Sequence, residues 1–105
     1  MAIEKKQIDR VVRRIVEDYD PKAIIIFGAV AKGTDDDSDL DMIVVMDSDL
    51  PRFDRTVEVR FSLGILDFPM VLLVYTPEEF EERRDDFSTV VYEAVRTGVV
   101  VYGSA

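Results

Sequence analysis

Asp39 and Asp41 are the strongest candidates for chemistry in this sequence, because of their residue type and their spacing. They lie two apart where an apolar run begins, and because side chains alternate along a strand, both carboxylates project from one face. Leu40 and Met42 then point to the opposite face, into the core. Two converging carboxylates repel unless a cation lies between them, and Mg²⁺ binds one or two carboxylates together with water and phosphate oxygens. The pair therefore predicts a site for Mg²⁺ or Mn²⁺.

A glycine turn lies upstream of this pair. The β-branched run Ala23–Phe27 is typical of a buried central strand and ends at Gly28. Ala29 follows, and a single helical turn closed by Gly33 comes next. Backbone N–H groups at a helix start hold phosphate, and Gly28 and Ala29 allow a close approach because neither has bulk beyond Cβ. The polar residues 34–38 are predicted to form a loop that brings this turn beside the aspartates.

Each feature has an ordinary explanation when it stands alone. An Asp-x-Asp pair in an acidic chain is most often a solvated strand end, and a glycine followed by a small residue is usually only a turn. The aspartates at 35–37 are best explained as loop surface. The order of strand, glycine turn, helical turn and strand makes the two features neighbours, and this combination favours a nucleotide site that includes a metal ion.

Composition narrows the chemistry further. The 105 residues, 48% apolar and 33% charged, suit one globular domain over residues 1–105. Histidine and cysteine are absent, which excludes Ser–His and Cys–His nucleophiles and the usual zinc ligands, so oxygen must bind any metal.

Charge is unevenly distributed along the chain. The net charge is −9, with seven Lys/Arg against five Asp/Glu (+2) in residues 1–33 and six against seventeen (−11) in residues 34–105. Such an acidic chain is a poor candidate for binding nucleic acid, because phosphate neutralisation needs a basic surface. The acidic surface has a simple alternative role, which is to keep the protein soluble.

Hydropathy gives no sign of a membrane segment. No run of 18 apolar residues occurs, and residues 1–10 are too polar for a secretory signal. The sequence therefore predicts a cytoplasmic protein without membrane association.

Apolar periodicity and capping signals predict the helices. Intervals of three and four from Ile3 to Tyr19 indicate an amphipathic helix, which ends at Asp20 because the residue before proline avoids the helical region. Phe53, Val57 and Phe61 recur every four residues and indicate a helix over 51–64. Two more helices are expected, one opened by Thr76-Pro77-Glu78-Glu79 and one capped by Ser88 and ended by Gly98.

The strands fall between these helices. They are expected at 23–27, 39–46, 70–75 and 99–102, with the last at an edge of the sheet. Together the elements predict an α/β (α+β) domain, a small mixed β-sheet covered by helices.

The stretch from Phe27 to Met42 resembles the motif of the DNA polymerase beta-like nucleotidyltransferase superfamily. That motif is a hydrophobic residue, glycine, then glycine or serine, a gap, and Asp-hydrophobic-Asp/Glu-hydrophobic. Here nine residues separate Ala29 from Asp39. The chain as a whole is similar to the minimal nucleotidyltransferase (MNT) branch, whose small members are little more than the catalytic domain. Residues 75–80 and 98–102 extend the resemblance over most of the chain.

The resemblance implies magnesium-dependent transfer of a nucleoside monophosphate from a nucleoside triphosphate such as ATP to a hydroxyl. Asp39 and Asp41 match the catalytic metal-binding pair, and Gly28 and Lys32 match positions beside the triphosphate. MNT proteins often pair with a helical HEPN protein in toxin–antitoxin modules, and some adenylylate a tyrosine of that partner. A HEPN-type partner is therefore implied, and a homo-oligomer is compatible with the sequence.

Two positions depart from the family motif. Ala29 stands where serine or glycine is usual, and a lost hydroxyl to phosphate costs about 1–3 kcal/mol. A third carboxylate, thought to act as the base on the attacking hydroxyl, aligns with Val71. The nearest acid is Asp67, four residues earlier and about 13 Å away at ~3.3 Å per residue of extended chain. Asp67 is either a replacement base brought back by a loop or a plain turn or cap residue.

These departures leave two functions open, beside the alternative that the chain is an unrelated acidic α/β domain. One is a nucleotidyltransferase, and the other is a degenerate domain that binds nucleotide or partner as an antitoxin or scaffold. Loss of a general base costs on the order of 10²–10⁴-fold in rate, so a slow enzyme stays compatible with the sequence.

Overall fold

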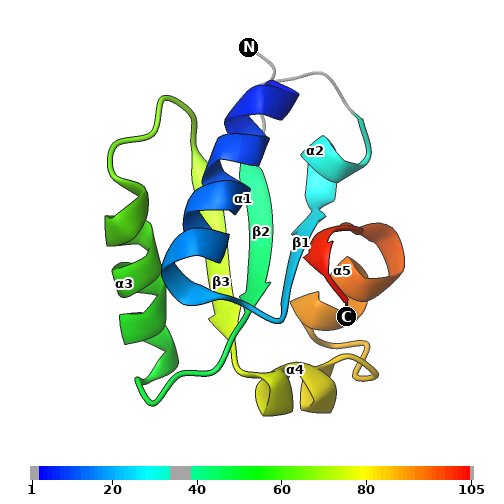
Figure 1. Cartoon of the computed structure of the whole chain (residues 1–105). Coiled ribbons are helices and arrows are strands. Elements are labelled where there is room, and N and C mark those ends of the chain that lie inside the picture. Colours follow the sequence, from blue (N-terminus) through cyan, green and yellow to red (C-terminus); the bar gives the residue numbers. More distant parts are fainter. Residues whose placement is uncertain (1–2, 34–38, 105) are drawn as a thin grey trace.

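The computed structural model describes residues 3–33 and 39–104. Its centre is a four-stranded sheet in the order β3-β2-β1-β4 (Figure 1). β2 and β3 are parallel, whereas β1 is antiparallel to both of its neighbours. The strand bounds are β1 Ala23–Phe27, β2 Leu40–Val45, β3 Met70–Tyr75 and β4 Val99–Gly103. The mixed sheet expected from the sequence is therefore confirmed.

The helices of the described residues follow the predicted order along the chain. Their bounds are α1 Lys5–Tyr19, α2 Gly28–Ala31, α3 Arg52–Leu63, α4 Pro77–Arg83 and α5 Val90–Thr97. α4 starts as predicted, because Thr76 and Glu79 form a capping box and Pro77 takes the first helical position. Within the described parts of the chain, no helix has both the length and the hydrophobicity to cross a bilayer.

The expectation that Ser88 caps α5 is wrong by one residue. Thr89 is the N-cap, and its side-chain oxygen accepts a hydrogen bond from Tyr92 N at 3.3 Å. Ser88 instead donates its hydroxyl to Asp86 Oδ1 at 2.7 Å. Asp86 thus holds the Ser88 side chain within the turn, and the next hydroxyl along the chain takes the cap.

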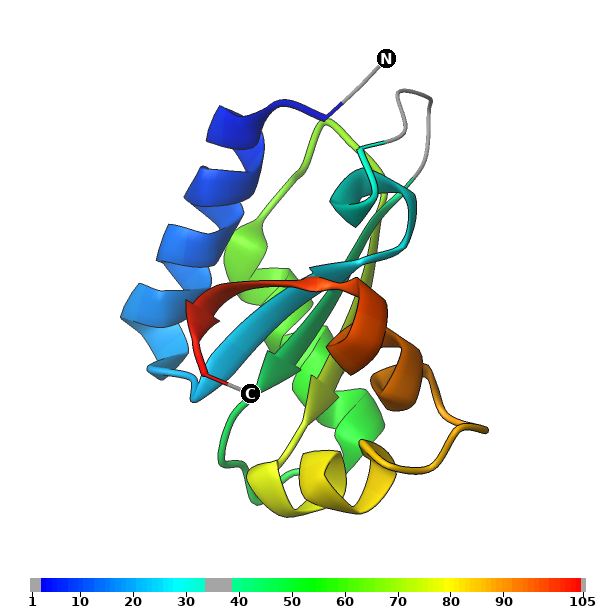
Figure 2. The same ribbon diagram turned by 90° about the vertical axis from the view of Figure 1, so that its right-hand side faces the viewer.

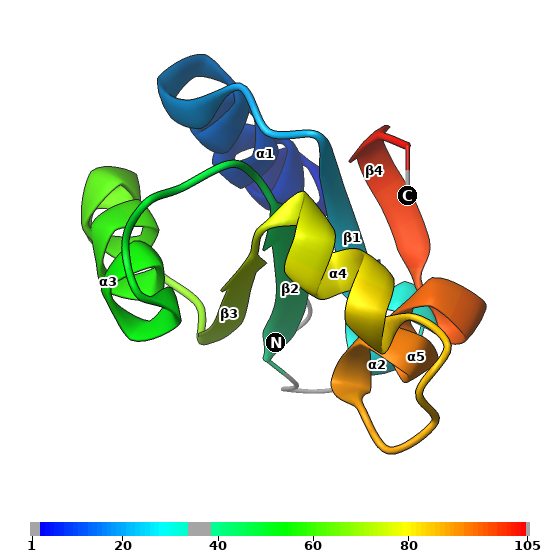
Figure 3. The ribbon, with the colours of Figure 1, turned by 90° about the horizontal axis from the view of Figure 1, so that it is seen from below.

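Helices cover both faces of the sheet, as Figures 2 and 3 show. The face under α1 and α3 buries Ile24, Ile26, Leu40, Met42, Val44 and Val74. The opposite face, under α4 and α5, buries Ala23, Ile25, Phe27, Ile43, Val45 and Tyr75. Because both faces are packed, the central strand β1 is buried at all five positions, which explains its unbroken apolar sequence.

α3 forms where the four-residue spacing of Phe53, Val57 and Phe61 predicts a helix, but these three side chains are exposed. The buried side of α3 carries Arg55 and Val59 instead. The apolar spacing therefore located the helix without identifying the side that packs on the sheet.

Arg55 of α3 links this helix to the start of α4 through hydrogen bonds. Its guanidinium donates to both carboxylate oxygens of Glu79, at 2.6 and 3.3 Å, and its Nε donates to Leu50 O at 2.7 Å. Glu79 also accepts from Thr76 N at 2.9 Å. The hydrogen bond from Arg55 is the main reason that the pKa of Glu79 is lowered from its usual value. A buried arginine is satisfied here because these hydrogen bonds go to a carbonyl and a carboxylate.

Candidate active site

Asp41 lies at the end of the sheet where β2 begins. In the strand register it is paired with Phe27 of β1 on one side and with Val71 of β3 on the other. Leu40 and Met42 are fully buried on the α1 and α3 face, as predicted, so alternation along β2 directs Asp41 to the opposite face.

The Asp41 carboxylate lies directly against the glycine turn. Gly28 has φ +75°, and a Cβ built on it would collide with Asp41 Oδ2 and lie 3.3 Å from Asp41 Cγ. A side chain at position 28 would thus be strained by the backbone and excluded by the carboxylate. The structure therefore brings the predicted phosphate turn and one acid of the predicted pair into contact.

The other predicted nucleotide-binding residues follow Gly28 through α2. Ala29 lies within this helix, and Lys32 is its exposed C-terminal cap. Gly33 comes next, with φ +76°. The loop predicted to join this turn to the aspartates, residues 34–38, lies outside the described residues.

Asp41 is surrounded by negative charge. Partial burial raises the pKa of Asp41, and the nearby carboxylates of Asp39 and Glu93 raise it further. Asp39 is exposed, just before β2. None of the salt bridges found among the described residues involves Asp39 or Asp41. The site thus places carboxylates together without a protein cation to neutralise them, in that part of the chain.

Glu93 is a residue of this site that sequence reasoning missed. It lies on α5, whose Val91 and Ala94 pack on the same face of the sheet as Ile43. Glu93 itself is exposed, and its charge contributes to the raised pKa of Asp41. Nothing in the local sequence distinguishes it from other exposed acids on helices, because only the packing of α5 over β1 brings it near the end of β2.

Val71 occupies the strand position where the resemblance described above implies a third carboxylate. It pairs with Asp41 in register and is 40% exposed, so this strand position is open to solvent beside the acid pair. An apolar side chain therefore occupies a place from which an acid would reach toward Asp41.

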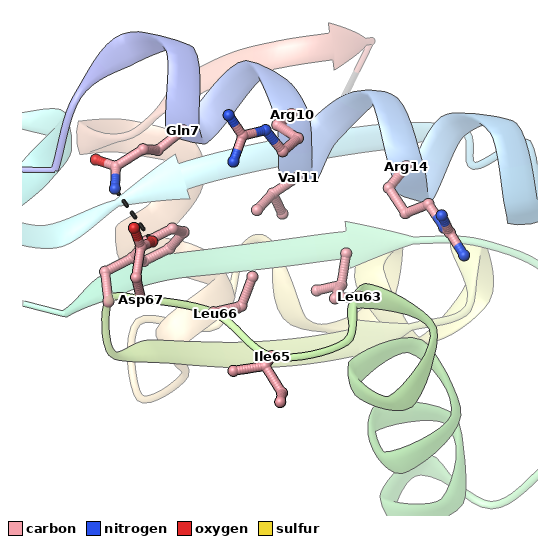
Figure 4. A pocket seen from close by; sticks show the side chains of 9 residues that line it. Gln7, Arg10, Val11, Arg14, Leu63, Ile65, Leu66 and Asp67 are labelled. Carbon is pink, nitrogen blue, oxygen red and sulfur yellow. Dashed lines mark hydrogen bonds between the residues drawn. The ribbon is translucent and has the colours of Figure 1, made fainter.

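The structure does not bring Asp67 to the acid pair. Its carboxylate accepts a hydrogen bond from Gln7 Nε2 of α1 at 3.2 Å. Figure 4 shows Asp67 beside Gln7, and it lines a hollow that includes Arg10 and Val11 of the same helix. Asp67 thus faces α1, whereas Asp41 projects from the opposite face of the sheet. The prediction of Asp67 as a replacement base is not favoured by this placement.

The donor set suits a divalent cation that is shared with a ligand. Among residues 3–33 and 39–104, no cluster of three or more His, Cys, Asp or Glu side chains is placed to hold a metal ion alone. Two neighbouring carboxylates match the way Mg²⁺ binds together with nucleotide phosphates and water. The residues present therefore fit a metal–nucleotide site better than a metal site built by protein alone.

Comparisons with known proteins bear on the family and the fold. A family model described as "Nucleotidyltransferase domain" matches residues 8–101. A solved toxin–antitoxin with AMP-PNP superimposes with a TM-score of 0.61 at 18% identity, covering 91% of this chain and 73% of the other. A presumed nucleotidyltransferase of Sulfolobus solfataricus gives a TM-score of 0.55 at 21% identity, covering 98% and 92%.

At these identities the two structures show only that this chain shares their fold. A search of curated proteins found no match. The family model spans nearly the whole chain and includes Gly28, Asp39 and Asp41. The chain therefore belongs to the nucleotidyltransferase domain family.

Proposed function

We propose that this protein transfers a nucleoside monophosphate from a nucleoside triphosphate, ATP in the first instance, to a hydroxyl of a partner protein. The observation that carries the proposal is the contact between the Asp41 carboxylate and the Gly28 turn. This contact places the Asp41 carboxylate, a cation-binding group, beside the Gly28 turn, which suits a phosphate. A triphosphate with its metal ion needs both groups within a few ångströms of each other.

The roles of the residues follow from their positions. Gly28, Ala29 and the first turn of α2 receive the triphosphate, because a helix start presents N–H groups and positive dipole to phosphate. Lys32 and Gly33 follow at the end of this helix, where the lysine adds positive charge near the phosphates.

Asp39 and Asp41 are the metal-binding pair in this proposal. They would hold Mg²⁺ or Mn²⁺, which supplies charge neutralisation on the transferred phosphoryl group when it is bound. The raised pKa of Asp41 fits this role, because a carboxylate crowded by Asp39 and Glu93 gains most from a nearby cation.

The reaction joins the acceptor oxygen to the α-phosphorus and breaks the bond from that phosphorus to the bridging oxygen, so pyrophosphate leaves. Val71 offers no base for the proton of the acceptor hydroxyl, and Asp67 lies on the other face of the sheet. We therefore expect a slow enzyme whose catalysis rests on positioning and charge, with the proton passed to water.

A partner protein is proposed as the acceptor for two reasons. The superimposed toxin–antitoxin was solved with AMP-PNP, an analogue of ATP, and its fold covers 91% of this chain. The resemblance to MNT proteins points to a HEPN-type helical partner and to an antitoxin role in the cytoplasm.

Val71 and Ala29 favour a second candidate function. A domain that has lost the third carboxylate and the motif hydroxyl is able to keep nucleotide or partner binding without turnover. In that case the protein neutralises its partner by association alone.

Labelled ATP separates the two functions. The chain is incubated with α-³²P-ATP, Mg²⁺ and the protein encoded by the adjacent reading frame, and label on each protein is followed by gel. The proposal expects label on the partner that Asp39→Asn and Asp41→Asn abolish, while Asp67→Asn leaves it in place. A stable complex that never acquires label from wild type would support the second function.

A further inference from the structure

The outer side of α3 carries a ridge of exposed apolar residues. Phe53, Val57 and Phe61 recur every four residues along α3 and are 77%, 49% and 85% exposed, and Ile65, just beyond the Gly64 cap of the helix, is 103% exposed. We call these four residues the α3 ridge. Isolated apolar side chains are normal on a protein surface, but a contiguous row of large ones marks an interaction site.

Core packing does not explain the α3 ridge. The side of α3 that faces the sheet is formed by Val59, which is fully buried, and by Arg55, which is bound to Glu79. Because the ridge points the other way, its side chains contribute little apolar burial to this chain. The sequence nevertheless places two phenylalanines there.

Two hollows meet at the end of the α3 ridge. One, of about 570 Å³, is lined by Val57, Phe61 and Ile65 together with Arg60 and Gly64. The other, of about 420 Å³, lies between α1 and the segment 63–68 that leads to β3, and Figure 4 shows it from close by. Ile65 lines both hollows, so they adjoin at this residue, one on the side of α3 and the other on the side of α1.

The rim of this surface is basic, although the chain has a net charge of −9. Arg60 lines the first hollow, and Arg10 and Arg14 line the second, whose single acid, Asp67, is hydrogen-bonded to Gln7.

The arginines differ in how far they are already engaged. Arg14 is paired with Asp18, and Arg60 donates to Met70 O. Arg10 has no salt bridge among the described residues, so its charge is open to a partner there.

The arginines at the rim indicate which kind of partner this surface would bind. Asp54 and Glu58 are exposed on α3 but line neither hollow, so the positive rim lies at the Ile65 end. A second copy docked through the same surface would set these arginines against themselves. An acidic partner is complementary to them.

We propose that the α3 ridge and its two hollows dock an amphipathic helix of a second protein, whose apolar side chains fill the hollows and whose acidic residues face Arg10 and Arg60. A row of side chains spaced by four residues is the ridge that inserts into the groove of another helix. In this mode of recognition, apolar side chains on one face of the bound helix fill the hollows. Charged residues at the rim determine the orientation of that helix.

The surface leads toward the candidate active site. Segment 63–68 runs into β3, whose first residue, Met70, pairs with Leu40 between the two aspartates. A partner seated on the ridge therefore lies toward the end of the sheet that carries Asp39 and Asp41. That this partner also presents the acceptor hydroxyl rests on the proposed function, whereas the docking itself does not.

Two synthetic helical peptides test the docking. Both are about 18 residues long, or roughly five helical turns, with leucines on one face; one carries glutamates along the rim and the other lysines. Binding is measured by fluorescence anisotropy, and the contact surface is mapped by amide shifts in NMR. We expect the glutamate peptide to bind at least about tenfold more tightly, as charge complementarity favours, and to shift residues 57–66 and the middle of α1.

Matched variants locate the contact. Phe61→Ser should weaken binding of the glutamate peptide, by about tenfold or more for a large apolar anchor. Phe87→Ser, at an 84% exposed phenylalanine between α4 and α5, should leave binding unchanged. Arg10→Glu should weaken it as well, with Arg13→Glu, which lines neither hollow, as its control.

Three outcomes would overturn the docking proposal. They are equal binding of the two peptides, no binding of the glutamate peptide, and a chain dimer, seen by sedimentation, that Phe61→Ser dissociates. Asp39→Asn should leave peptide binding intact. Loss of label transfer with intact peptide binding would therefore count against the proposed function alone.

Discussion

Glu79 and Asp41 are two carboxylates of one small domain that meet opposite electrostatic surroundings. Glu79 lies at the start of α4, where the hydrogen bond from Arg55 lowers its pKa. Asp41 lies where β2 begins, where burial and the charges of Asp39 and Glu93 raise its pKa. The first carboxylate has its cation within the protein, and the second is surrounded by further acids.

The difference separates a carboxylate that holds the fold from one that, in the proposed function, binds a cation and its nucleotide. Glu79 links α3 and α4 through Arg55 and caps a helix with the same side chain. The raised pKa of Asp41 means that its charged form disfavours folding, and in the proposed function a bound cation offsets this cost. Four substitutions probe this contrast.

Val71→Asp adds a third carboxylate next to Asp41 and should have the largest effect. It places an acid at the register position opposite Asp41, where a base for the acceptor hydroxyl is absent. We expect the rate of label transfer to rise on the order of 10²-fold or more, because a general base is worth about 10²–10⁴-fold. Val100→Asp, at a similarly exposed valine of β4, is the control and should not change the rate.

Arg55→Met removes the cation of Glu79. The Arg55 side chain is 8% exposed and that of Glu79 30%, so Glu79 loses its partner in a partly buried place. We expect about 2 kcal/mol of lost stability in urea unfolding, below the roughly 3–5 kcal/mol of fully buried pairs because water reaches Glu79. The double variant Arg55→Met with Glu79→Met should recover part of the loss. If Arg55→Met alone were as stable as wild type, the claim that the Arg55–Glu79 pair stabilises the fold would be wrong.

Asp41→Asn should stabilise the protein in the absence of metal and nucleotide. It removes a charge that Asp39 and Glu93 oppose, and we expect a gain below about 1 kcal/mol, as is usual for partly solvated charges. Since the pKa of Asp41 is higher in the folded state, its protonation favours folding at low pH, and this stability is lost as pH rises through the raised pKa.

The thermal melting curve measured from acid to neutral pH checks this prediction. The advantage of Asp41→Asn should grow as the pH rises through the folded-state pKa of Asp41. A variant that melts below wild type at neutral pH would show instead that the Asp41 carboxylate is favourably placed without a ligand.

Glu93→Gln should have the smallest effect. It removes one of the two charges that raise the pKa of Asp41, so the carboxyl ¹³C titration of Asp41 should move to lower pH. Glu82→Gln, at an exposed acid of α4, should leave this titration unchanged. If the titration of Asp41 were unchanged in Glu93→Gln, Glu93 of α5 would have no electrostatic effect on the candidate site.

The fold was predictable wherever local pattern decided it. The run Ala23–Phe27 and the capping box of Thr76 and Glu79 each specify an element without help from distant residues. The side of the sheet on which Asp41 lies likewise follows from strand alternation, with Leu40 and Met42 buried on the other side. These are short-range rules, and the structure follows them.

The rest depends on contacts between distant segments. Glu93 lies near Asp41 because α5 packs across β1, and Asp67 faces α1, where Gln7 donates a hydrogen bond to it. The side of α3 that packs inward was likewise not predictable. Arg55 is buried there because it binds Glu79 of α4, which lies 24 residues later in the sequence. Apolar spacing alone assigns phenylalanines to the core, and a partner surface has the same spacing.

Binding of Mn²⁺ together with an ATP analogue is the sharpest test of whether Asp39 and Asp41 hold a metal ion against a nucleotide. Water-proton relaxation reports the bound ion, and it is measured for wild type, Asp39→Asn and Asp41→Asn at equal protein concentration. We predict an enhancement that requires the analogue in wild type and is lost in both variants. Enhancement that survives both substitutions would place the ion elsewhere and contradict the proposed role of the pair.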